Sequence, residues 1–143
     1  MRFSALKKIA DEGIPIAVRI DPIIPGLTSD RQDLEEIVSR ASEIGVKQIT
    51  ASIIKPARGF FRDLRAENPD LSRKLYEVYA DGEWISGYKY LSREKRRGIL
   101  KGLRKSVLEA GLGFAACREG LPQLNTAICD GTAYCRELLD RFA

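Results

Sequence analysis

The sequence predicts a single α/β domain built on a parallel sheet of three strands. Helix-like and strand-like patterns alternate along the chain, which is the order that repeated βα units produce. A length of 143 residues with 44% hydrophobic content suits one domain spanning 1–143, and is too short for two ordinary domains. Residues 14–54 follow a strand, helix, strand order and therefore predict a right-handed parallel crossover.

The first predicted strand, residues 14–21, is apolar until it ends in the charged residues Arg19 and Asp21, with prolines beyond them. Pro22 and Pro25 have no amide donor and a fixed φ, so we expect strand pairing to stop near Asp21. The strand would then present Arg19 and Asp21 at a working surface. Alternatively, these two side chains pair with each other or cap neighbouring chain.

One helix is expected before this strand in the sequence and another after it. Apolar residues at helical spacing indicate a short helix over 3–10 that ends at Gly13. A capping box at 29–32 begins a second helix, whose apolar face ends at Gly45. The β-branched residues of 46–54 then predict a buried second strand.

The second half of the chain is predicted to be mainly helical, with one more strand. Residues 55–68 fit either a short helix or a lid, whereas Asn68 and the proline after it mark a clear helix start. Ser92 is expected to cap a long helix. A third strand over 114–118 follows, and a last helix is expected from Thr132.

Two side-chain groups in this half have alternative interpretations. Trp84, Tyr88 and Tyr90 lie in a glycine-rich connection, where they either stack on a ligand or close the end of the core. The long helix carries a basic face, here called the basic stripe, which either contacts phosphate or is a solvated helix face. The basic stripe consists of Arg93, Arg97, Lys101, Arg104 and Lys105.

Composition narrows the possible functions. The net charge of +4, from 24 basic and 20 acidic residues, suits an anionic ligand without requiring nucleic acid. Because the chain has no histidine, no Ser-His or Cys-His nucleophile pair and no histidine-containing metal site can form within it. No apolar run approaches the length of a membrane span, and residues 1–10 lack a signal-peptide core, so we expect a cytoplasmic protein without membrane contact.

Candidate functional residues follow each predicted strand. The carboxyl ends of parallel strands meet at one edge of a sheet, together with the loops and helix starts that come after them. If the three strands are adjacent, that edge gathers charged, hydroxyl and thiol side chains. They are Arg19 and Asp21 from the first strand, Ser52 and Lys55 from the second, and Cys117, Arg118 and Glu119 from the third.

The cysteines Cys117, Cys129 and Cys135 are spaced C-x11-C-x5-C, without the paired knuckle of a small zinc or cluster site. Cys135 shares a helical face with apolar residues and is expected to be a core thiol. Cys129 precedes a helix start, where free amides and the helix dipole would lower its pKa. Cys117 and Cys129 could therefore bind a metal, form a redox-active pair or be two structural thiols.

Three strings of the sequence carry a resemblance to a known family. RIDPIIPG at 19–26, CREG at 117–120 and NTAICDG at 125–131 resemble the C-terminal part of spore photoproduct lyase-like radical S-adenosylmethionine proteins. The resemblance covers nearly the whole chain and depends most on the spacing between the first two strings. It implies that the fold is the later, (βα)3 half of a partial TIM-type barrel.

The resemblance also implies a cofactor site. Enzymes of this kind use S-adenosylmethionine and a reduced 4Fe-4S iron-sulfur cluster to generate a deoxyadenosyl radical. By the resemblance, Arg19, Asp21 and Ile23 would approach the adenosyl moiety and Ser52 the adenine, so the chain would contribute cofactor and substrate contacts. It lacks the CxxxCxxC cluster motif, so the 4Fe-4S cluster would be bound outside this chain.

A half-barrel leaves the edges of its first and third strands open. We therefore expect a partner, either a separate N-terminal half that carries the cluster or a second copy of this chain in a homodimer. Two alternatives from other classes stay open at this point. One is a non-enzymatic nucleic-acid-binding module that uses the basic helix 93–105, and the other is a small cysteine–metal protein.

Overall fold

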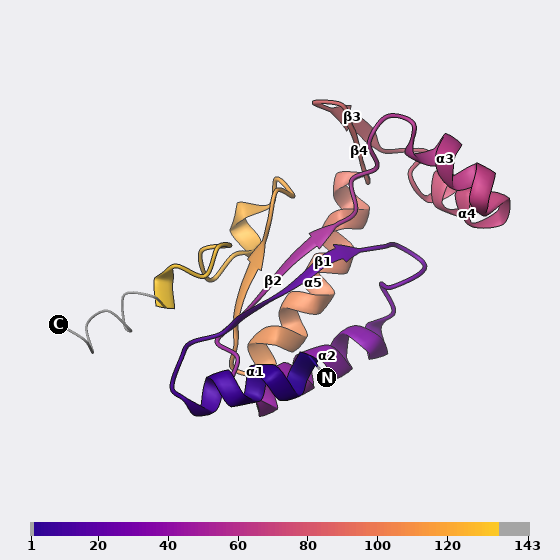
Figure 1. Cartoon of the computed structure of the whole chain (residues 1–143). Coiled ribbons are helices and arrows are strands. Elements are labelled where there is room, and N and C mark those ends of the chain that lie inside the picture. The colour runs from indigo at the N-terminus through magenta and orange to yellow at the C-terminus, as the bar shows by residue number, and fades with distance from the viewer. Residues whose placement is uncertain (1, 135–143) are drawn as a thin grey trace.

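Three parallel strands form the central sheet, in the order β1-β2-β5 (Figure 1). The computed structural model describes residues 2–134. The α/β class and the parallel three-stranded sheet predicted from the sequence are confirmed, and the described strands do not close into a barrel. The elements are α1 (Arg2–Asp11), β1 (Ala17–Ile23), α2 (Arg31–Glu43), β2 (Gln48–Ile53), α3 (Phe60–Glu67), α4 (Pro69–Val78), β3 (Glu83–Ile85), β4 (Tyr88–Tyr90), α5 (Arg93–Glu109), β5 (Gly113–Ala116) and the 3-10 turn η1 (Pro122–Leu124).

The middle strand, β2, is buried at all six of its residues. Side chains alternate between the two faces of a strand, and Ile49 of β2 pairs with Phe114 of β5 on the core side, where both are 0% exposed. Gln48 and Thr50 point to the opposite face. There they donate hydrogen bonds to the carbonyls of Ile128 and Cys129, at 2.7 and 3.0 Å. The segment 125–131 therefore covers part of the second face of the sheet.

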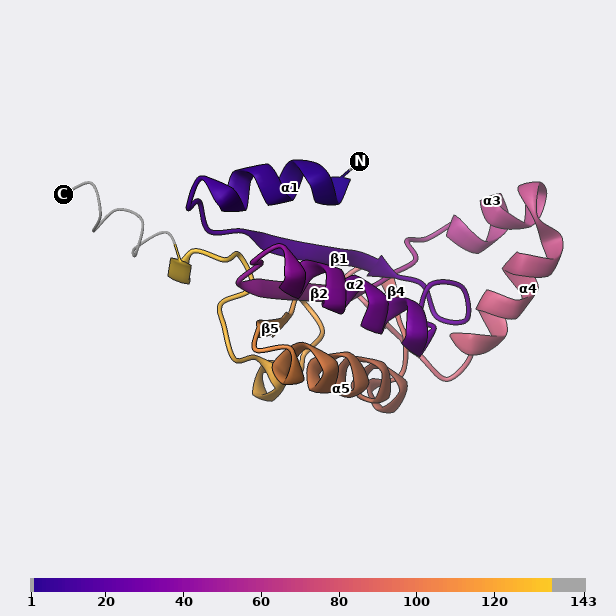
Figure 2. The same ribbon diagram turned by 90° about the horizontal axis from the view of Figure 1, so that it is seen from below.

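The helices α2 and α5 pack together on the other face of the sheet (Figure 2). Apolar residues at helical spacing give each helix one buried side, with Val38 of α2 and Leu100 and Val107 of α5 in the core. Ser42 Oγ donates to the carbonyl of Ala110 at 3.2 Å, which joins the C-terminal ends of the two helices. Helix α1 lies beyond the edge strand β1 in the same view.

The end of the first predicted strand differs from its prediction. We expected pairing to stop near Asp21, but β1 runs to Ile23, where the amide of Ile54 donates to the Ile23 carbonyl at 2.9 Å. The register shifts between Ile20 and Ile23, so Pro22 lies in the part of the strand where its missing amide breaks no ladder bond. The Asp21–Pro22 peptide bond is cis.

The start of α2 also differs from its prediction. The N-cap is Asp30, whose Oδ1 accepts hydrogen bonds from the amides of Gln32 and Asp33 at 2.8 and 3.3 Å. Ser29, the expected start of a capping box, accepts instead from the amide of Gly26 at 2.9 Å. Ser29 therefore closes the turn after β1, and the apolar face of the helix is as predicted.

Residues 55–90 form a smaller unit made of α3, α4 and the β3–β4 hairpin (Figure 1). The stretch that fitted either a short helix or a lid contains α3. Asn68 caps α4 as predicted, because its side chain accepts an amide hydrogen bond from the first turn. Phe61 of α3 packs edge-on against Tyr76 and Tyr79, with ring centroids 5.3 and 6.1 Å away. These aromatic contacts hold the two helices together.

The aromatic connection before α5 folds as the β3–β4 hairpin, which was not predicted. Ser86 and Gly87 both have positive φ, 49° and 84°, which is the backbone of a two-residue hairpin turn. Of the three aromatic residues, only Tyr90 is buried, whereas Trp84 and Tyr88 are 51% and 41% exposed. The expectation that these aromatics close the core therefore holds for Tyr90 alone.

The two edges of the sheet are not equivalent. Beside β5, the amide of Thr126 donates to the Phe114 carbonyl at 2.8 Å, and the amide of Ala116 donates to Asn125 Oδ1 at 2.7 Å. The expected open edge at β5 is thus occupied by the chain itself. Beside β1, no strand within residues 2–134 pairs with the outer edge. The predicted open edge exists only at β1 in this part of the chain.

Two C-terminal predictions lie outside the described residues. The last helix is expected from Thr132, so most of it falls beyond residue 134, and Cys135 does so too. Within residues 2–134, no helix is both long enough and apolar enough to cross a membrane.

Candidate functional site

A cavity of about 310 Å³ opens at the carboxyl ends of the parallel strands. It contains most of the residues predicted for this edge, because β1, β2 and β5 are adjacent and end together. The hairpin adds Tyr88, which the sequence did not place there. The polar part of the wall consists of Arg19, Asp21, Ser52, Lys55, Cys117 and Arg118.

Three predicted residues do not line the cavity, namely Ile23, Glu119 and Cys129. Ile23 is 0% exposed and belongs to the hydrophobic core, where it is packed with residues such as Ile53. Glu119 is also buried, at 1% exposed, beside the cavity. Ile23 therefore supports strand β1 from the core, and Glu119 organises the charged groups beside the cavity.

Arg19 and Asp21 form an ion pair, with 2.8 Å between Nη2 and Oδ2. Arg19 Nη1 also donates to the carbonyl of Cys129 at 3.3 Å, and Arg19 lines the cavity together with Cys117. The hydrogen bond with Asp21, followed by the interaction with Cys117, raises the pKa of Arg19 above its ordinary value. The two side chains thus pair with each other and still line the cavity, where they offer a ligand one donor and one acceptor group.

Lys55 and Glu119 form a buried ion pair, with 2.6 Å between Nζ and Oε1 and side chains that are 11% and 0% exposed. The ammonium group also donates to Ser52 Oγ at 2.8 Å and to the carbonyl of Ile53 at 3.0 Å. These three bonds use all three of its protons. Lys55 is therefore a structural cation in this arrangement and is not available as a general base.

Glu119 joins the ends of β2 and β5. Its Oε1 also accepts from the amide of Ile53 at 2.8 Å and from Ser52 Oγ at 3.2 Å. Its Oε2 is buried and has no hydrogen-bond partner among the described residues. Arg118, the preceding residue, has a φ of +58° and is exposed. The loop therefore buries one side chain and leaves the neighbouring guanidinium at the mouth of the cavity.

Cys117 and Cys129 are free thiols, both partly exposed, and they lie near each other on the same face of the sheet. The lowered pKa predicted for Cys129 is wrong. Burial, followed by the contact with Cys117, raises the pKa of Cys129 above its ordinary value. The helix-dipole argument fails because Cys129 lies against the face of the sheet, where its carbonyl accepts a hydrogen bond from Thr50 Oγ1 at 3.0 Å.

We expect Cys129 to react with iodoacetamide faster in a Cys117→Ala variant than in the unchanged protein at mildly alkaline pH. The thiolate is the reactive form, and the substitution removes the Cys117 contributions to the raised pKa of Cys129. The contribution of burial to the pKa remains, so the alkylation rate of Cys129 should increase only a few-fold. The rise of this rate with pH should also begin at a lower pH in the variant. Timed alkylation followed by peptide mass spectrometry measures the rate in the variant and in the unchanged protein. A slower or equal rate would contradict the thiol contact.

The donor atoms of the described residues do not fit a 4Fe-4S cluster. Such clusters are held by cysteine thiolates, four in the usual case, and residues 2–134 contain only Cys117 and Cys129. Across these residues, no group of three or more cysteine, aspartate, glutamate or histidine side chains gathers as a metal site would require. A cluster would have to take its thiolates from elsewhere.

The basic stripe is separate from this cavity. Arg97 and Lys101 are exposed on α5, and neither lines the cavity. Arg104 has a structural contact, because its Nε donates to the carbonyl of Leu124 at 2.9 Å and so holds η1 against the helix. Part of the stripe therefore stabilises the fold, and the rest is a helix face open to solvent.

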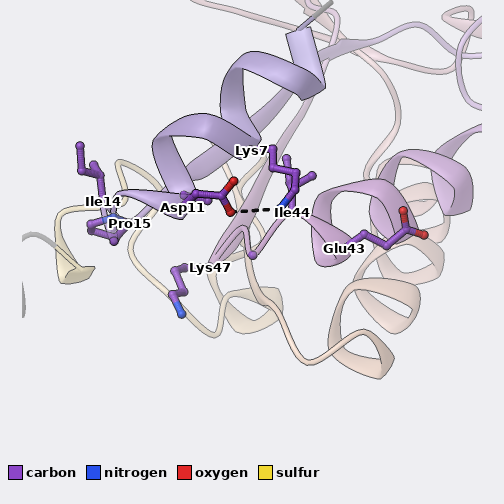
Figure 3. A pocket seen from close by; sticks show the side chains of 10 residues that line it. Lys7, Asp11, Ile14, Pro15, Glu43, Ile44 and Lys47 are labelled. Carbon is purple, nitrogen blue, oxygen red and sulfur yellow. Dashed lines mark hydrogen bonds and ion pairs between the residues drawn. The ribbon is translucent and has the colours of Figure 1, made fainter.

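A larger cavity, about 420 Å³, lies near the amino ends of the parallel strands, where the end of α1 approaches the end of α2 (Figure 3). Lys7 and Asp11 in its wall form an ion pair at 3.0 Å, joined by the dashed line in Figure 3, and Lys47 lies nearby. Exposed pairs of this kind contribute little energy. Because this edge holds the amino ends of the parallel strands, where functional groups seldom gather, the smaller cavity is the candidate site.

The fold and the cavity together define an α/β protein with a mixed-charge pocket at the carboxyl edge of a parallel sheet. A comparison of the chain with profiles of known protein families, with curated proteins and with solved structures finds no match. The features that indicate a function are therefore the cavity itself and the resemblance carried by residues 19–26, 117–120 and 125–131.

Proposed function

We propose that this chain is the C-terminal part of a radical S-adenosylmethionine enzyme of the spore photoproduct lyase-like group. It would supply cofactor and substrate contacts to a 4Fe-4S cluster that is carried elsewhere. The observation that carries the proposal is the cavity at the carboxyl edge of the sheet, where Arg19 and Asp21 meet Ser52, Cys117 and Arg118. Ligands of open parallel α/β sheets bind at this edge.

The chemistry of the cavity suits the parts of S-adenosylmethionine. Arg118 is exposed at its mouth and would take a carboxylate, whereas Asp21 would accept from an ammonium or from ribose hydroxyls. Tyr88 and Ile54 offer aromatic and apolar surface to a base. A volume of about 310 Å³ lies at the lower end of small-molecule sites and suits a nucleoside-sized group. The bound cofactor would supply the radical, and these residues would bind and orient it.

The open edge of β1 supports the partial TIM-type barrel in this proposal. A barrel continues through strands added side by side, and the outer edge of β1 is unpaired within residues 2–134. Helix α1 on the same side keeps part of its apolar face uncovered, since Ile9 is 41% exposed and Leu6 is only partly buried. The N-terminal half that carries the cluster, or a second copy of this chain in a homodimer, would cover both features.

Calorimetric titration with S-adenosylmethionine tests this function. We expect the chain to bind it, and to bind it more tightly when co-purified with an N-terminal half that carries the CxxxCxxC motif. Arg118→Met should weaken binding about 10- to 100-fold, because a hydrogen bond to a charged group contributes about 1.5–3 kcal/mol. Arg62→Met is the matched control, since Arg62 is exposed on α3 and pairs only with Asp63 among the contacts described.

Two results would contradict the proposal. The first is the absence of binding heat both for the chain alone and for the chain with the N-terminal half. The second is a chain that stays monomeric in light scattering and does not bind a co-expressed N-terminal half. The proposal requires the unpaired β1 edge to bind one of these two partners.

A further inference from the structure

Cys117 and Cys129 lie on the same face of the sheet although they belong to different segments. Side chains alternate along a strand, so Cys117 shares the face of Ala115, whose strand partner Thr50 bonds to the Cys129 carbonyl. Cys117 directly follows β5, and its amide donates to the carbonyl of Ala51 at 2.9 Å. Cys129 lies on the face of the sheet, where its carbonyl accepts from Thr50 Oγ1 at 3.0 Å and from Arg19 Nη1 at 3.3 Å. Both main chains are therefore anchored to the sheet, and this anchoring holds the two side chains near each other on one face.

The segment between the two cysteines is anchored as well. Asn125 Oδ1 accepts from the amide of Ala116 at 2.7 Å, and Thr126 Oγ1 accepts from the amide of Phe114 at 2.9 Å. Figure 1 shows this segment leaving β5 and running back beside it. The chain is thus folded back on itself before Cys129, which brings the second thiol to the first one.

The surroundings of the two thiols differ. Cys117 lines the cavity beside the guanidinium group of Arg19, and a nearby cation favours attack by a thiolate. Cys129 does not line the cavity, and its carbonyl is held by Arg19, whereas Cys117 is in the cavity wall, where a small disulfide can reach it. Cys117 is therefore the attacking thiol and Cys129 the resolving one.

We propose that Cys117 and Cys129 are a redox-active dithiol that exchanges with small-molecule disulfides and closes to an intramolecular disulfide. In the first step the Cys117 thiolate attacks one sulfur of glutathione disulfide, which forms a mixed disulfide and releases one glutathione thiolate. In the second step Cys129 loses its proton to solvent and attacks the Cys117 sulfur, which releases the second glutathione. Two protein thiols are oxidised and one glutathione disulfide is reduced to two glutathione molecules.

Closing this bond changes the wall of the candidate site. Cys117 lines the cavity together with Arg19, and a sulfur bonded to Cys129 no longer presents a thiol to the guanidinium. In the oxidised form, Arg19 of β1 would therefore have different neighbours in the cavity wall. The chemistry of the dithiol is independent of what the cavity binds. A test of the dithiol can therefore fail without contradicting the function proposed above, and the reverse is also true.

Oxidation of the reduced 143-residue chain with glutathione disulfide, both with and without earlier treatment with a chelator, tests the proposal. Free thiols are blocked with N-ethylmaleimide, and the chain is cut with trypsin and with a protease that cleaves before aspartate. Cleavage after Arg118 separates Cys117 from Cys129, and cleavage before Asp130 separates Cys129 from Cys135. We expect a Cys117–Cys129 linked peptide that dithiothreitol removes.

Three variants sharpen the test. Cys129→Ser should accumulate a stable mixed disulfide with glutathione at Cys117, because no resolving thiol follows. Cys135→Ser should form the same linked peptide as the unchanged chain. Arg19→Met should slow the first step several-fold while the linked product stays the same.

Any of three outcomes would overturn the proposal. They are a link between Cys117 and Cys135 in place of the expected one, two thiols that stay reduced, or mixed disulfides that never resolve in the unchanged chain. A fourth outcome would also overturn it: if the thiols are oxidised only in the chelator-treated sample, the pair holds a metal and the dithiol role is rejected.

Discussion

Replacing Lys55 by methionine should destabilise the protein by about 3–5 kcal/mol, the range found when one partner of a buried ion pair is removed. Glu119 is 0% exposed and accepts from Lys55 at 2.6 Å, so the substitution leaves a buried carboxylate without its counter-charge. Guanidinium chloride unfolding followed by far-UV circular dichroism measures the change in the free energy of unfolding.

Lys7→Met is the matched control, because Lys7 pairs with Asp11 at 3.0 Å with both side chains more than half exposed. Its effect should be no more than about 1 kcal/mol. The double variant Lys55→Met with Glu119→Gln should lose less stability than the sum of the two single variants, since it removes both charges. Equal losses for Lys55→Met and Lys7→Met would mean that the buried pair contributes nothing special.

Gly82→Ala is expected to destabilise the protein by about 1–3 kcal/mol or more, through overpacking against backbone that cannot easily move. A Cβ at Gly82 would lie 2.1 Å from the carbonyl oxygen of Tyr90 and 3.1 Å from that of Tyr79. The β3–β4 hairpin would have to shift away from α4, and Tyr88 would move with it from the cavity edge. Thermal or denaturant unfolding reports the loss.

Gly98→Ala provides the opposite expectation with the same chemical change. Gly98 is in the middle of α5, and a Cβ there meets nothing within 4 Å. Alanine is the better helix former by about 0.8–1 kcal/mol, so the variant should be stabilised by about that amount. If Gly82→Ala were as well tolerated as Gly98→Ala, the close approach of the hairpin to α4 would be refuted.

Much of the fold followed from local patterns that physical chemistry ties to one structure. The βαβ unit came from apolar runs of the right lengths, and the start of α4 came from Asn68 and its proline, whose roles are purely local. The hairpin was missed because its strands have only three residues each. Ser86 and Gly87 were the available signal, since a two-residue turn with positive φ favours such residues between aromatic strands.

The position of the candidate site was predictable, whereas its electrostatics were not. Adjacent parallel strands bring Arg19, Ser52 and Cys117 to one edge whatever the loops do. The burial of Glu119 depends on a loop conformation, the +58° φ of Arg118, which no sequence pattern marks. The pKa of Cys129 was predicted in the wrong direction because the segment's contact with the sheet face outweighs the helix start that follows it.

The unequal edges of the sheet limit how this chain can assemble. Within residues 2–134, segment 125–127 closes the β5 edge of the central sheet, so β1 is the strand of that sheet that can accept a neighbour. Edge-to-edge pairing of two copies about a two-fold axis would use both open strands at once, so growth would stop at the dimer and no filament could form through this edge. A single docking position also makes its occupants competitors. A second copy and an N-terminal half would displace one another, so adding an N-terminal half would lower the fraction of the chain that is dimeric.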